Sequence, residues 1–281
     1  MEFSEVLSYS IAMKQPRLFT HRGKDITKAD FVSALSKLGV KKGDIVLAHS
    51  GLQAFGKMSP RLTKETLARE VTHALLEAIG KSGTLVMPTF TYTFCKSRVF
   101  DSKKTRSEVG MLSEYFRAQK SVVRSRHPIF SVAASGKDAE ALTDVDMDSF
   151  GQKSFFAHLF DANGTILFLG GALFRNSCTF CIFIEQQEQI PYRFFKKFSG
   201  TLTDGSKKQK ITARYFVRPL NGDVSSNNSK LEKILRKKKL LKEVRLGASS
   251  IRAVKANDLY REAMLLLQND TYALLDHKPQ V

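Results

Sequence analysis

Helix and strand patterns alternate through the first half of the chain. Helical stretches carry apolar residues at helical spacing, several of them opened by a threonine and closed by a glycine, whereas short apolar runs indicate buried strands. Strands separated by helices at this spacing predict an α/β fold with a mixed, partly parallel sheet flanked by helices. The helices are expected at 27–38, 63–79, 112–118, 137–143 and 154–160, and the strands at 44–49, 83–88, 130–134 and 165–169.

The second half has a different pattern. Residues 196–202 and 208–217, joined through Asp204 and Gly205, predict a β-hairpin. Residues 230–245 combine many lysines and arginines with leucines at helical spacing, so we expect a basic amphipathic helix there. A polar loop at 221–229, a strand at 250–254 and a helix at 257–267 complete the expected elements. We treat residues 1–281 as a single domain, with a core at 25–195 and a hairpin and helical part at 196–281.

The composition is that of a globular protein. Apolar residues make up 42% of the 281 residues, and no apolar run approaches the ~20 residues that a membrane helix needs. The acidic start of the chain lacks the features of a signal peptide, which predicts a cytoplasmic protein. Three cysteines cannot form a disulfide framework, so we expect free thiols.

The formal net charge of +18 is the one unusual feature of the composition. Such a charge favours anionic partners: a nucleic acid, an anionic membrane surface or a nucleotide cofactor. The basic segment 230–245 is the main argument for nucleic-acid binding. Its leucines, however, indicate a buried face, and no known nucleic-acid-binding signature accompanies it. Nucleic acid is therefore the less favoured partner, and we expect no membrane partner.

Two candidate ligand-binding segments follow predicted strands directly. Ser50 and Gly51 come after the first strand, and Thr89 and Phe90 come after the second. Ligands of open α/β sheets bind beyond the carboxyl ends of strands, where small residues allow close approach. The alternative for both segments is an ordinary turn after a strand.

Two further segments carry polar or reactive side chains. Residues 124–131 contain two arginines, two serines and a histidine, which suit either an anion site or a polar loop before a strand. Thr179 is expected to cap a helix that places Cys178, either Cys181 or Ile182, and Glu185 on neighbouring faces. The pair Cys178 and Cys181 lacks the partners that zinc requires, so we expect no metal.

Taken in order, these segments resemble the aminoglycoside 3-N-acetyltransferase family. Each motif is weak alone, but the ordered set is specific, and the resemblance covers roughly residues 25–195. The residues that carry it are Leu38–Asp44, Ala48–Leu52, Phe55, Gly56, Gly83–Thr91, Phe100, Asp101, Thr105, Val109, Gly110, Arg124, Ser125, His127, Pro128, Ser131, Phe150, Gly151, Ser154, Leu167–Gly170, Thr179 and Glu185.

The resemblance implies direct transfer of an acetyl group from acetyl-CoA to the amino group of an amino sugar, with release of CoA. Such a reaction needs a base for the ammonium group and donors for the developing oxyanion. By analogy, Thr89 and Phe90 are candidates on the acceptor side. The candidates for the acetyl-CoA side are Ser50, Gly51, Leu52, Arg124, Ser125, His127 and Ser131.

The fourth segment departs from the family at one position. The family pattern there is Thr-x-x-His-x-x-Glu, with the histidine as base and the glutamate orienting it. Thr179 and Glu185 match the pattern, but position 182 is an isoleucine, which cannot move protons. Three explanations stay open: another base such as Glu185, a substitution introduced into an active enzyme, or a catalytically weak relative that still binds CoA. Among the histidines only His127 is considered as a substitute, and a ligand contact suits it better.

The acceptor and the oligomeric state stay open at this point. Aminoglycosides are polycations, whose recognition usually calls for acidic side chains. A chain with a net charge of +18 suits an anionic, nucleotide-linked amino sugar better, and such a sugar, as used in surface-polysaccharide synthesis, is the alternative acceptor. A homodimer is also left open.

Overall fold

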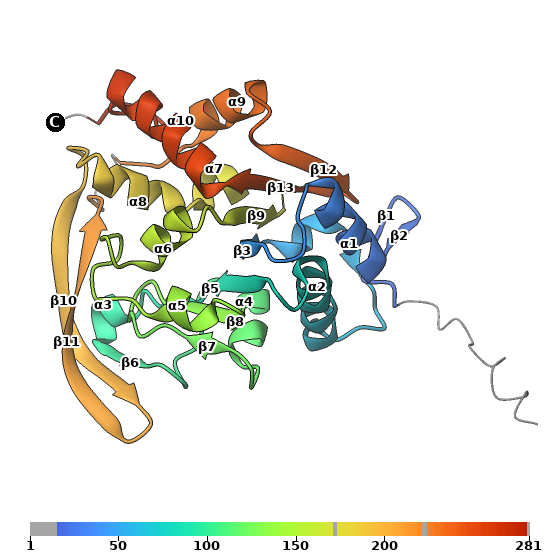
Figure 1. Ribbon diagram of the computed structural model, residues 1–281, viewed down its shortest axis with the longest axis horizontal. Helices are drawn as coiled ribbons and strands as arrows, with labels where there is room; N and C mark the ends of the chain where they lie inside the picture. Colours follow the sequence, from blue (N-terminus) through green and yellow to red (C-terminus); the bar gives the residue numbers. More distant parts are fainter. Residues whose placement is uncertain (1–15, 171–172, 221–223, 280–281) are drawn as a thin grey trace, which may run out of the picture.

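The computed structural model describes residues 16–170, 173–220 and 224–279, and a mixed seven-stranded sheet forms its centre (Figure 1). The three central strands, β9 (Thr165–Leu169), β3 (Ile45–Ser50) and β5 (Thr84–Pro88), are parallel, so their carboxyl ends meet at one edge. Antiparallel strands flank them, which confirms the predicted mixed, partly parallel sheet. The outer strands are β12 (Lys242–Leu246), β13 (Ser249–Lys255), β8 (Val132–Gly136) and β7 (Val123–Arg124).

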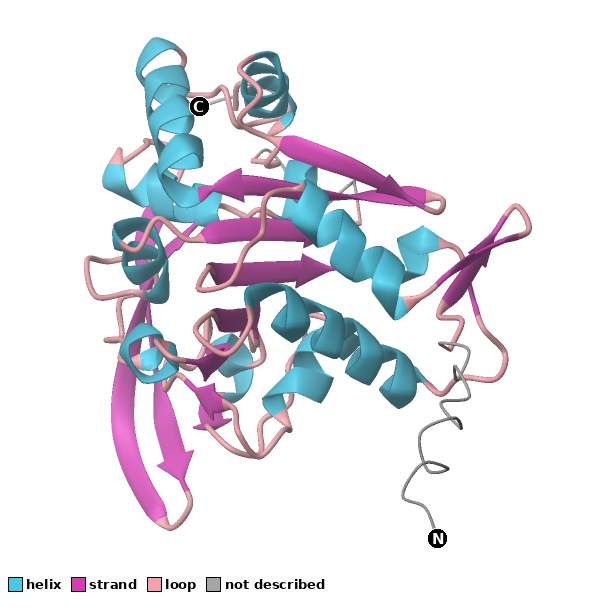
Figure 2. Cartoon of the chain, turned by 45° about the vertical axis from the view of Figure 1, so that its right-hand side comes forward, coloured by secondary structure: helices cyan, strands magenta, loops and turns pink. Residues whose placement is uncertain are grey.

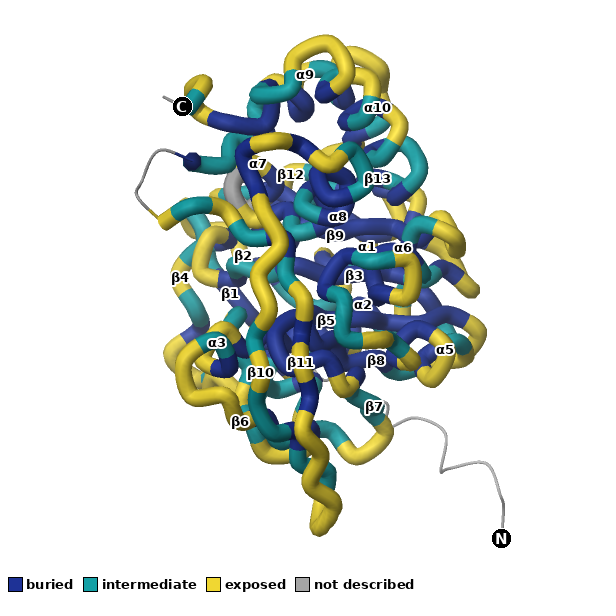
Figure 3. The backbone as a smooth tube through the Cα atoms, turned by 90° about the vertical axis from the view of Figure 1, so that its left-hand side faces the viewer, coloured by how far each residue is buried: buried dark blue, intermediate teal, exposed yellow. Residues whose placement is uncertain are grey.

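Alternate residues of each central strand enter different hydrophobic cores, because successive side chains of a strand point to opposite faces. In β3, Val46 and Ala48 belong to one core and Leu47 to the other. Helices cover both faces of the sheet (Figure 2), and the central strands are buried along their length (Figure 3). One core contains α1 (Lys28–Lys37), α2 (Lys64–Ile79) and α4 (Met111–Arg117); the other contains α5 (Ala139–Thr143), α6 (Phe155–Asp161), α8 (Phe180–Gln187) and α10 (Ala256–Asn269).

The helices of the first half begin where the sequence predicts. The hydroxyl of Thr63 accepts a hydrogen bond from the backbone N–H of Thr66 at 3.0 Å, and α2 ends at Gly80 with a φ of 63°. The carboxylate of Asp30 accepts the backbone N–H of Thr27 at 2.8 Å, which closes the first turn of α1. Local polar contacts therefore fix the ends of these helices.

The predicted hairpin is confirmed and is longer than expected. Strands β10 (Phe194–Asp204) and β11 (Lys207–Val217) pair along their whole length, and Gly205 takes a φ of 64° in the turn between them. The hairpin runs along one side of the molecule (Figure 1). The short strand β6 (Val99–Asp101) pairs with β10, and α3 (Phe94–Ser97) precedes it.

The prediction of one basic helix over 230–245 is wrong. Helix α9 (Ser229–Lys237) ends early, Lys239 takes a left-handed φ of 58°, and the chain then enters β12, which pairs with β13. Basic residues of this segment also meet carboxylates: Arg236 pairs with Glu232, and Lys238 pairs with Glu262. The segment therefore does not present the continuous basic helical face that motivated nucleic-acid binding.

The C-terminal part shares the central sheet, because β13 pairs with β9. The predicted loop at 221–229 lies partly outside the described residues. Across the ranges given above, none of the helices combines the length and the apolar character that crossing a bilayer requires.

Candidate active site

A cavity of about 320 Å³ lies at the carboxyl ends of the parallel strands. Ser50 at the end of β3 and Pro88 at the end of β5 form one side of it, and α8 with the end of α7 (Leu173–Ser177) forms another. This is the edge of an open α/β sheet at which ligands bind. The lining residues are His49, Ser50, Pro88, Phe90, Tyr92, Val109, Ser177, Cys178, Thr179, Cys181, Ile182, Glu185, Ser226 and Asn228.

Three of the four candidate segments meet in this cavity. Ser50, Phe90 and the residues of the Thr179–Glu185 segment line it, although they are far apart in the sequence. Gly51 and Leu52 follow Ser50 but are not among its lining residues: the N–H of Gly51 donates to the carbonyl of Leu169 at 2.8 Å, and the Leu52 side chain is buried in a core. The site is thus assembled by the convergence of strand ends.

Thr179 precedes α8 as predicted, but its side chain does not cap the helix. Its φ of −63° and ψ of −25° are helical, whereas a capping residue is normally extended. Cys178 alone separates it from α7, so the chain has little room to adopt the extended geometry. Thr179 and the partly buried Ile182 both line the cavity.

Glu185 is the carboxylate of the described lining, and it is already engaged. Its side chain is 2% exposed, and its Oε1 accepts the hydroxyl proton of Tyr192 at 2.8 Å. Its Oε2 lies 2.8 Å from Nε of the buried Arg193, an ion pair whose N–H is not aligned for a hydrogen bond. Burial raises the pKa of Glu185, while Arg193 and Tyr192 oppose that shift. Both oxygens are therefore committed to partners that sequence reasoning did not identify.

His49 occupies the cavity wall at the end of β3. Its ring stacks on Phe168, with centroids 5.3 Å apart and planes 7° apart, and the residue is 6% exposed. Within the described residues its Nε2 has no hydrogen-bond partner. Burial lowers the pKa of His49 to about 4, so the ring is neutral near pH 7. The sequence alone indicates no role for this residue, because a single histidine in an apolar strand carries no distinctive signal.

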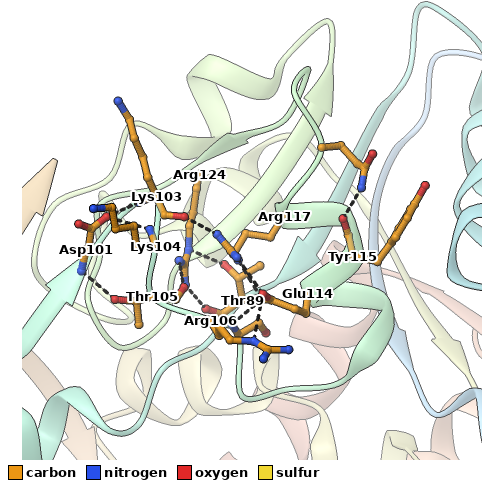
Figure 4. Close-up of polar contacts among 12 residues, drawn as sticks. Thr89, Asp101, Lys103, Lys104, Thr105, Arg106, Glu114, Tyr115, Arg117 and Arg124 are labelled. Carbon is orange, nitrogen blue, oxygen red and sulfur yellow. Dashed lines mark hydrogen bonds and ion pairs between the residues drawn. The ribbon is translucent and has the colours of Figure 1, made fainter. Parts of the chain in front are cut away.

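Arg124 holds the loops around the strand ends together (Figure 4). Its Nη2 donates to the carbonyl of Thr89 at 2.8 Å and its Nη1 to the carbonyl of Thr105 at 2.5 Å, while its Nε lies 3.2 Å from the hydroxyl of Ser131. The guanidinium also lies over the ring of Phe100. Most of its N–H groups thus face protein oxygens, although part of the side chain borders a second, more open hollow of about 920 Å³.

Three further polar residues of the 124–131 segment are buried and hydrogen bonded: Ser125, His127 and Ser131. The hydroxyl of Ser125 accepts the N–H of Val132 at 2.9 Å. Nδ1 of His127 accepts the N–H of Phe130 at 2.9 Å, and burial lowers the pKa of this histidine to about 4. These contacts agree with the alternative of a polar loop before a strand. Their assignment to the acetyl-CoA side stays a prediction.

The loop-anchoring role of Arg124 gives a stability prediction. Arg124→Met is expected to lower the free energy of unfolding by about 2–3 kcal/mol, because buried carbonyls lose a charged donor. Arg126→Met is the matched control: its residue is exposed, and within the described ranges its guanidinium makes one hydrogen bond, to Gln209 at 3.5 Å, so about 0.5 kcal/mol or less is expected. Urea unfolding monitored by circular dichroism measures both. Equal losses would contradict the anchoring role.

The cysteines of the cavity wall are free thiols, as expected. A hydrogen bond with Cys178 and burial together raise the pKa of Cys181, so this thiol stays protonated near pH 7. In the part of the chain that the structure describes, no three His, Cys, Asp or Glu side chains are grouped as a metal site would need.

Comparison with known proteins connects this site to a family. A sequence model described as aminoglycoside 3-N-acetyltransferase matches residues 47–268. Aminoglycoside N(3)-acetyltransferase IV of Salmonella sp is 26% identical over 257 residues, covering 90% of this chain and 91% of the relative. Aminoglycoside N(3)-acetyltransferase VIII of Streptomyces fradiae is 27% identical over 217 residues, covering 70% and 73%.

Solved structures share the fold. AAC-IIIb in a binary complex with CoASH superimposes with a TM-score of 0.75 at 20% identity, covering 90% of this chain and 99% of that one. AAC-VIa bound to sisomicin gives a TM-score of 0.70 at 22% identity, covering 87% and 98%. At these identities the likeness concerns the fold alone.

Proposed function

The chain belongs to the aminoglycoside 3-N-acetyltransferase family, and on that premise we propose that it transfers the acetyl group of acetyl-CoA to an amino group of an amino sugar. The cavity at the strand ends is the place where thioester and amine meet. One observation carries this assignment: the cavity joins the ends of β3 and β5 to the Thr179–Glu185 segment, which are the segments of the family resemblance.

The groups that line the cavity suit these reactants. They offer hydroxyls from Ser50, Ser177 and Thr179, and Glu185, the carboxylate among them, is ion-paired. A largely neutral, partly apolar site suits an uncharged thioester and the neutral amine that attacks it. We assign Ser50 to the thioester region and Phe90 to the acceptor, because both line the cavity.

The remaining candidates, Thr89 on the acceptor side and the others on the acetyl-CoA side, have a supporting role in this proposal. The polar atoms of Thr89, Arg124 and Ser131 bind one another or nearby backbone. We therefore assign these residues, with Ser125 and His127, to positioning the loop and strand ends. Gly51 and Leu52 act in the same way at the end of β3.

An amino sugar is the acceptor that the comparisons favour. The two relatives above are named for aminoglycosides, and AAC-VIa binds sisomicin in its solved structure. Neither a nucleotide-linked sugar nor a nucleic acid gains comparable support, and the basic helix that suggested nucleic acid is interrupted at Lys239.

Binding of the acetyl donor is tested by thermal protection. A ligand that binds the native state at about 100 times its Kd stabilises that state by about 2.7 kcal/mol, so CoA and acetyl-CoA are expected to raise Tm clearly. Differential scanning calorimetry measures the shift. Inorganic pyrophosphate at the same concentration is the control, because a chain with net charge +18 attracts polyanions in general. No shift with CoA, or an equal shift with pyrophosphate, would contradict the proposal.

A further inference from the structure

The proposed reaction needs a base, and the position expected to supply it is occupied by Ile182. We propose that His49 is that base, with its Nε2 taking the proton from the attacking amine. This inference rests on the proposed function. It starts from two observations: His49 is the histidine that lines the cavity, and its Nε2 has no partner within the described residues.

The surroundings of His49 hold its ring in place, and within the described residues they leave its buried Nε2 without a hydrogen-bond partner. The stack on Phe168 holds the ring plane, and the position of His49 at the end of β3 sets it next to Ser50 in the cavity wall. His127 is the instructive contrast. It is equally buried, but its Nδ1 accepts two backbone N–H groups, from Ile129 and Phe130, and its Nε2 lies 3.3 Å from the Ser149 hydroxyl.

The other ionisable groups of the cavity wall are less suited to accept a proton. Glu185 uses both oxygens for Tyr192 and Arg193. Cys181 and Tyr92 hold their protons firmly, because burial and neighbouring groups raise their pKa values. His49 is neutral near pH 7, since burial lowers its pKa to about 4.

The proton and electron pairs balance in this scheme. The amine lone pair forms a C–N bond with the thioester carbonyl carbon, and the carbonyl π pair moves to oxygen. His49 Nε2 removes one proton from the positively charged nitrogen of this tetrahedral intermediate. The carbonyl re-forms as the C–S bond breaks, its electron pair leaves on sulfur, and the imidazolium returns the proton to the thiolate, giving the amide and CoA thiol.

The low pKa of His49 has opposite effects on the two proton transfers. It makes the imidazole a weak base but keeps it unprotonated near pH 7, and it makes the imidazolium a strong acid toward the departing thiolate. The attacking nitrogen is most acidic within the tetrahedral intermediate, which is where a weak base suffices.

The test compares variants that separate chemistry from folding and binding. His49→Phe keeps an aromatic ring against Phe168 and removes both nitrogens, and His49→Gln is the second variant if the first loses stability. We expect kcat for thiol release with an amino-sugar acceptor to fall by about 100-fold or more, whereas protection by CoA persists. His73→Gln, on the exposed face of α2, is the control and is expected to match wild type.

A further variant tests position 182 directly. Ile182→His is expected not to raise kcat above the wild-type value, because a base is already present. Retention of wild-type kcat by a folded His49→Phe or His49→Gln protein, or a gain of about 100-fold in Ile182→His, would overturn the assignment of His49. A wild-type protein that releases no thiol with any amine would instead contradict the proposed function itself.

Discussion

Ser177→Trp is expected to lower kcat/KM for acetyl transfer by at least about 1,000-fold, equivalent to ~4 kcal/mol of transition-state binding. Ser177 is exposed at the end of α7 and also lines the cavity, so an indole at this position can occupy the space without entering a core. A cavity of about 320 Å³ cannot hold that ring together with a thioester and an amine. Steady-state thiol release measures the loss.

The control for this substitution places the same side chain on a remote helix. Ser36 is exposed on α1, which packs on the opposite face of the sheet from α8, and Ser36→Trp is expected to leave kcat/KM unchanged. Both variants should unfold at the wild-type Tm. Full activity of Ser177→Trp would show that acetyl transfer takes place elsewhere on the molecule.

Arg193→Met is expected to lower the free energy of unfolding at neutral pH by about 3–5 kcal/mol, because it leaves the Glu185 carboxylate buried without its cation. Methionine keeps part of the aliphatic volume of arginine, so loss of packing is limited. Each side chain of the pair is 2% exposed, which makes solvent a poor substitute for the lost partner. Urea unfolding gives the difference.

The pH dependence of this loss of stability shows whether the loss comes from the buried Glu185 charge or from altered packing. Burial raises the pKa of Glu185 above its ordinary value, and removing Arg193 is expected to raise it further. A carboxyl with a raised folded-state pKa favours folding below its unfolded pKa, about 4.3, and that contribution is lost as pH rises through the folded-state pKa. The loss of stability in Arg193→Met should therefore be smaller in acid than at neutral pH. A loss independent of pH would indicate that packing alone is responsible.

The double variant Arg193→Met with Glu185→Gln should recover part of the stability, because it removes the buried charge.

The sequence predicts the central sheet well because its signals there are local. Apolar runs at β3, β5 and β9 give the buried parallel strands, and Thr63 and Gly80 mark the ends of α2. The helix predicted to continue through residues 238–241 is absent for the opposite reason: the structure there is not determined by local signals. The leucines there continue a helical pattern, but a left-handed turn at Lys239 and pairing of β12 with β13 depend on tertiary contacts.

The candidate site shows the same difference between features that local sequence signals predict and features that depend on tertiary contacts. Ser50, Phe90 and the Thr179–Glu185 segment reach the cavity because the carboxyl ends of parallel strands converge. The partners of Glu185 could not be predicted, since Tyr192 and Arg193 reach it only after the chain turns at Gln189, whose φ is 51°. His49 lacked a sequence signal because its importance depends on an unpartnered nitrogen, which becomes visible only in three dimensions.

Following a labelled acetyl group is the most direct test of the proposed transfer from acetyl-CoA to an amino sugar. The wild-type protein is incubated with acetyl-CoA labelled in its acetyl carbon and with an aminoglycoside acceptor, and the products are followed by mass spectrometry together with thiol release. We expect the label on an amino group of the acceptor, with one acetyl group transferred for each thiol released. Label recovered only as free acetate, or no thiol release with any amino sugar, would contradict it.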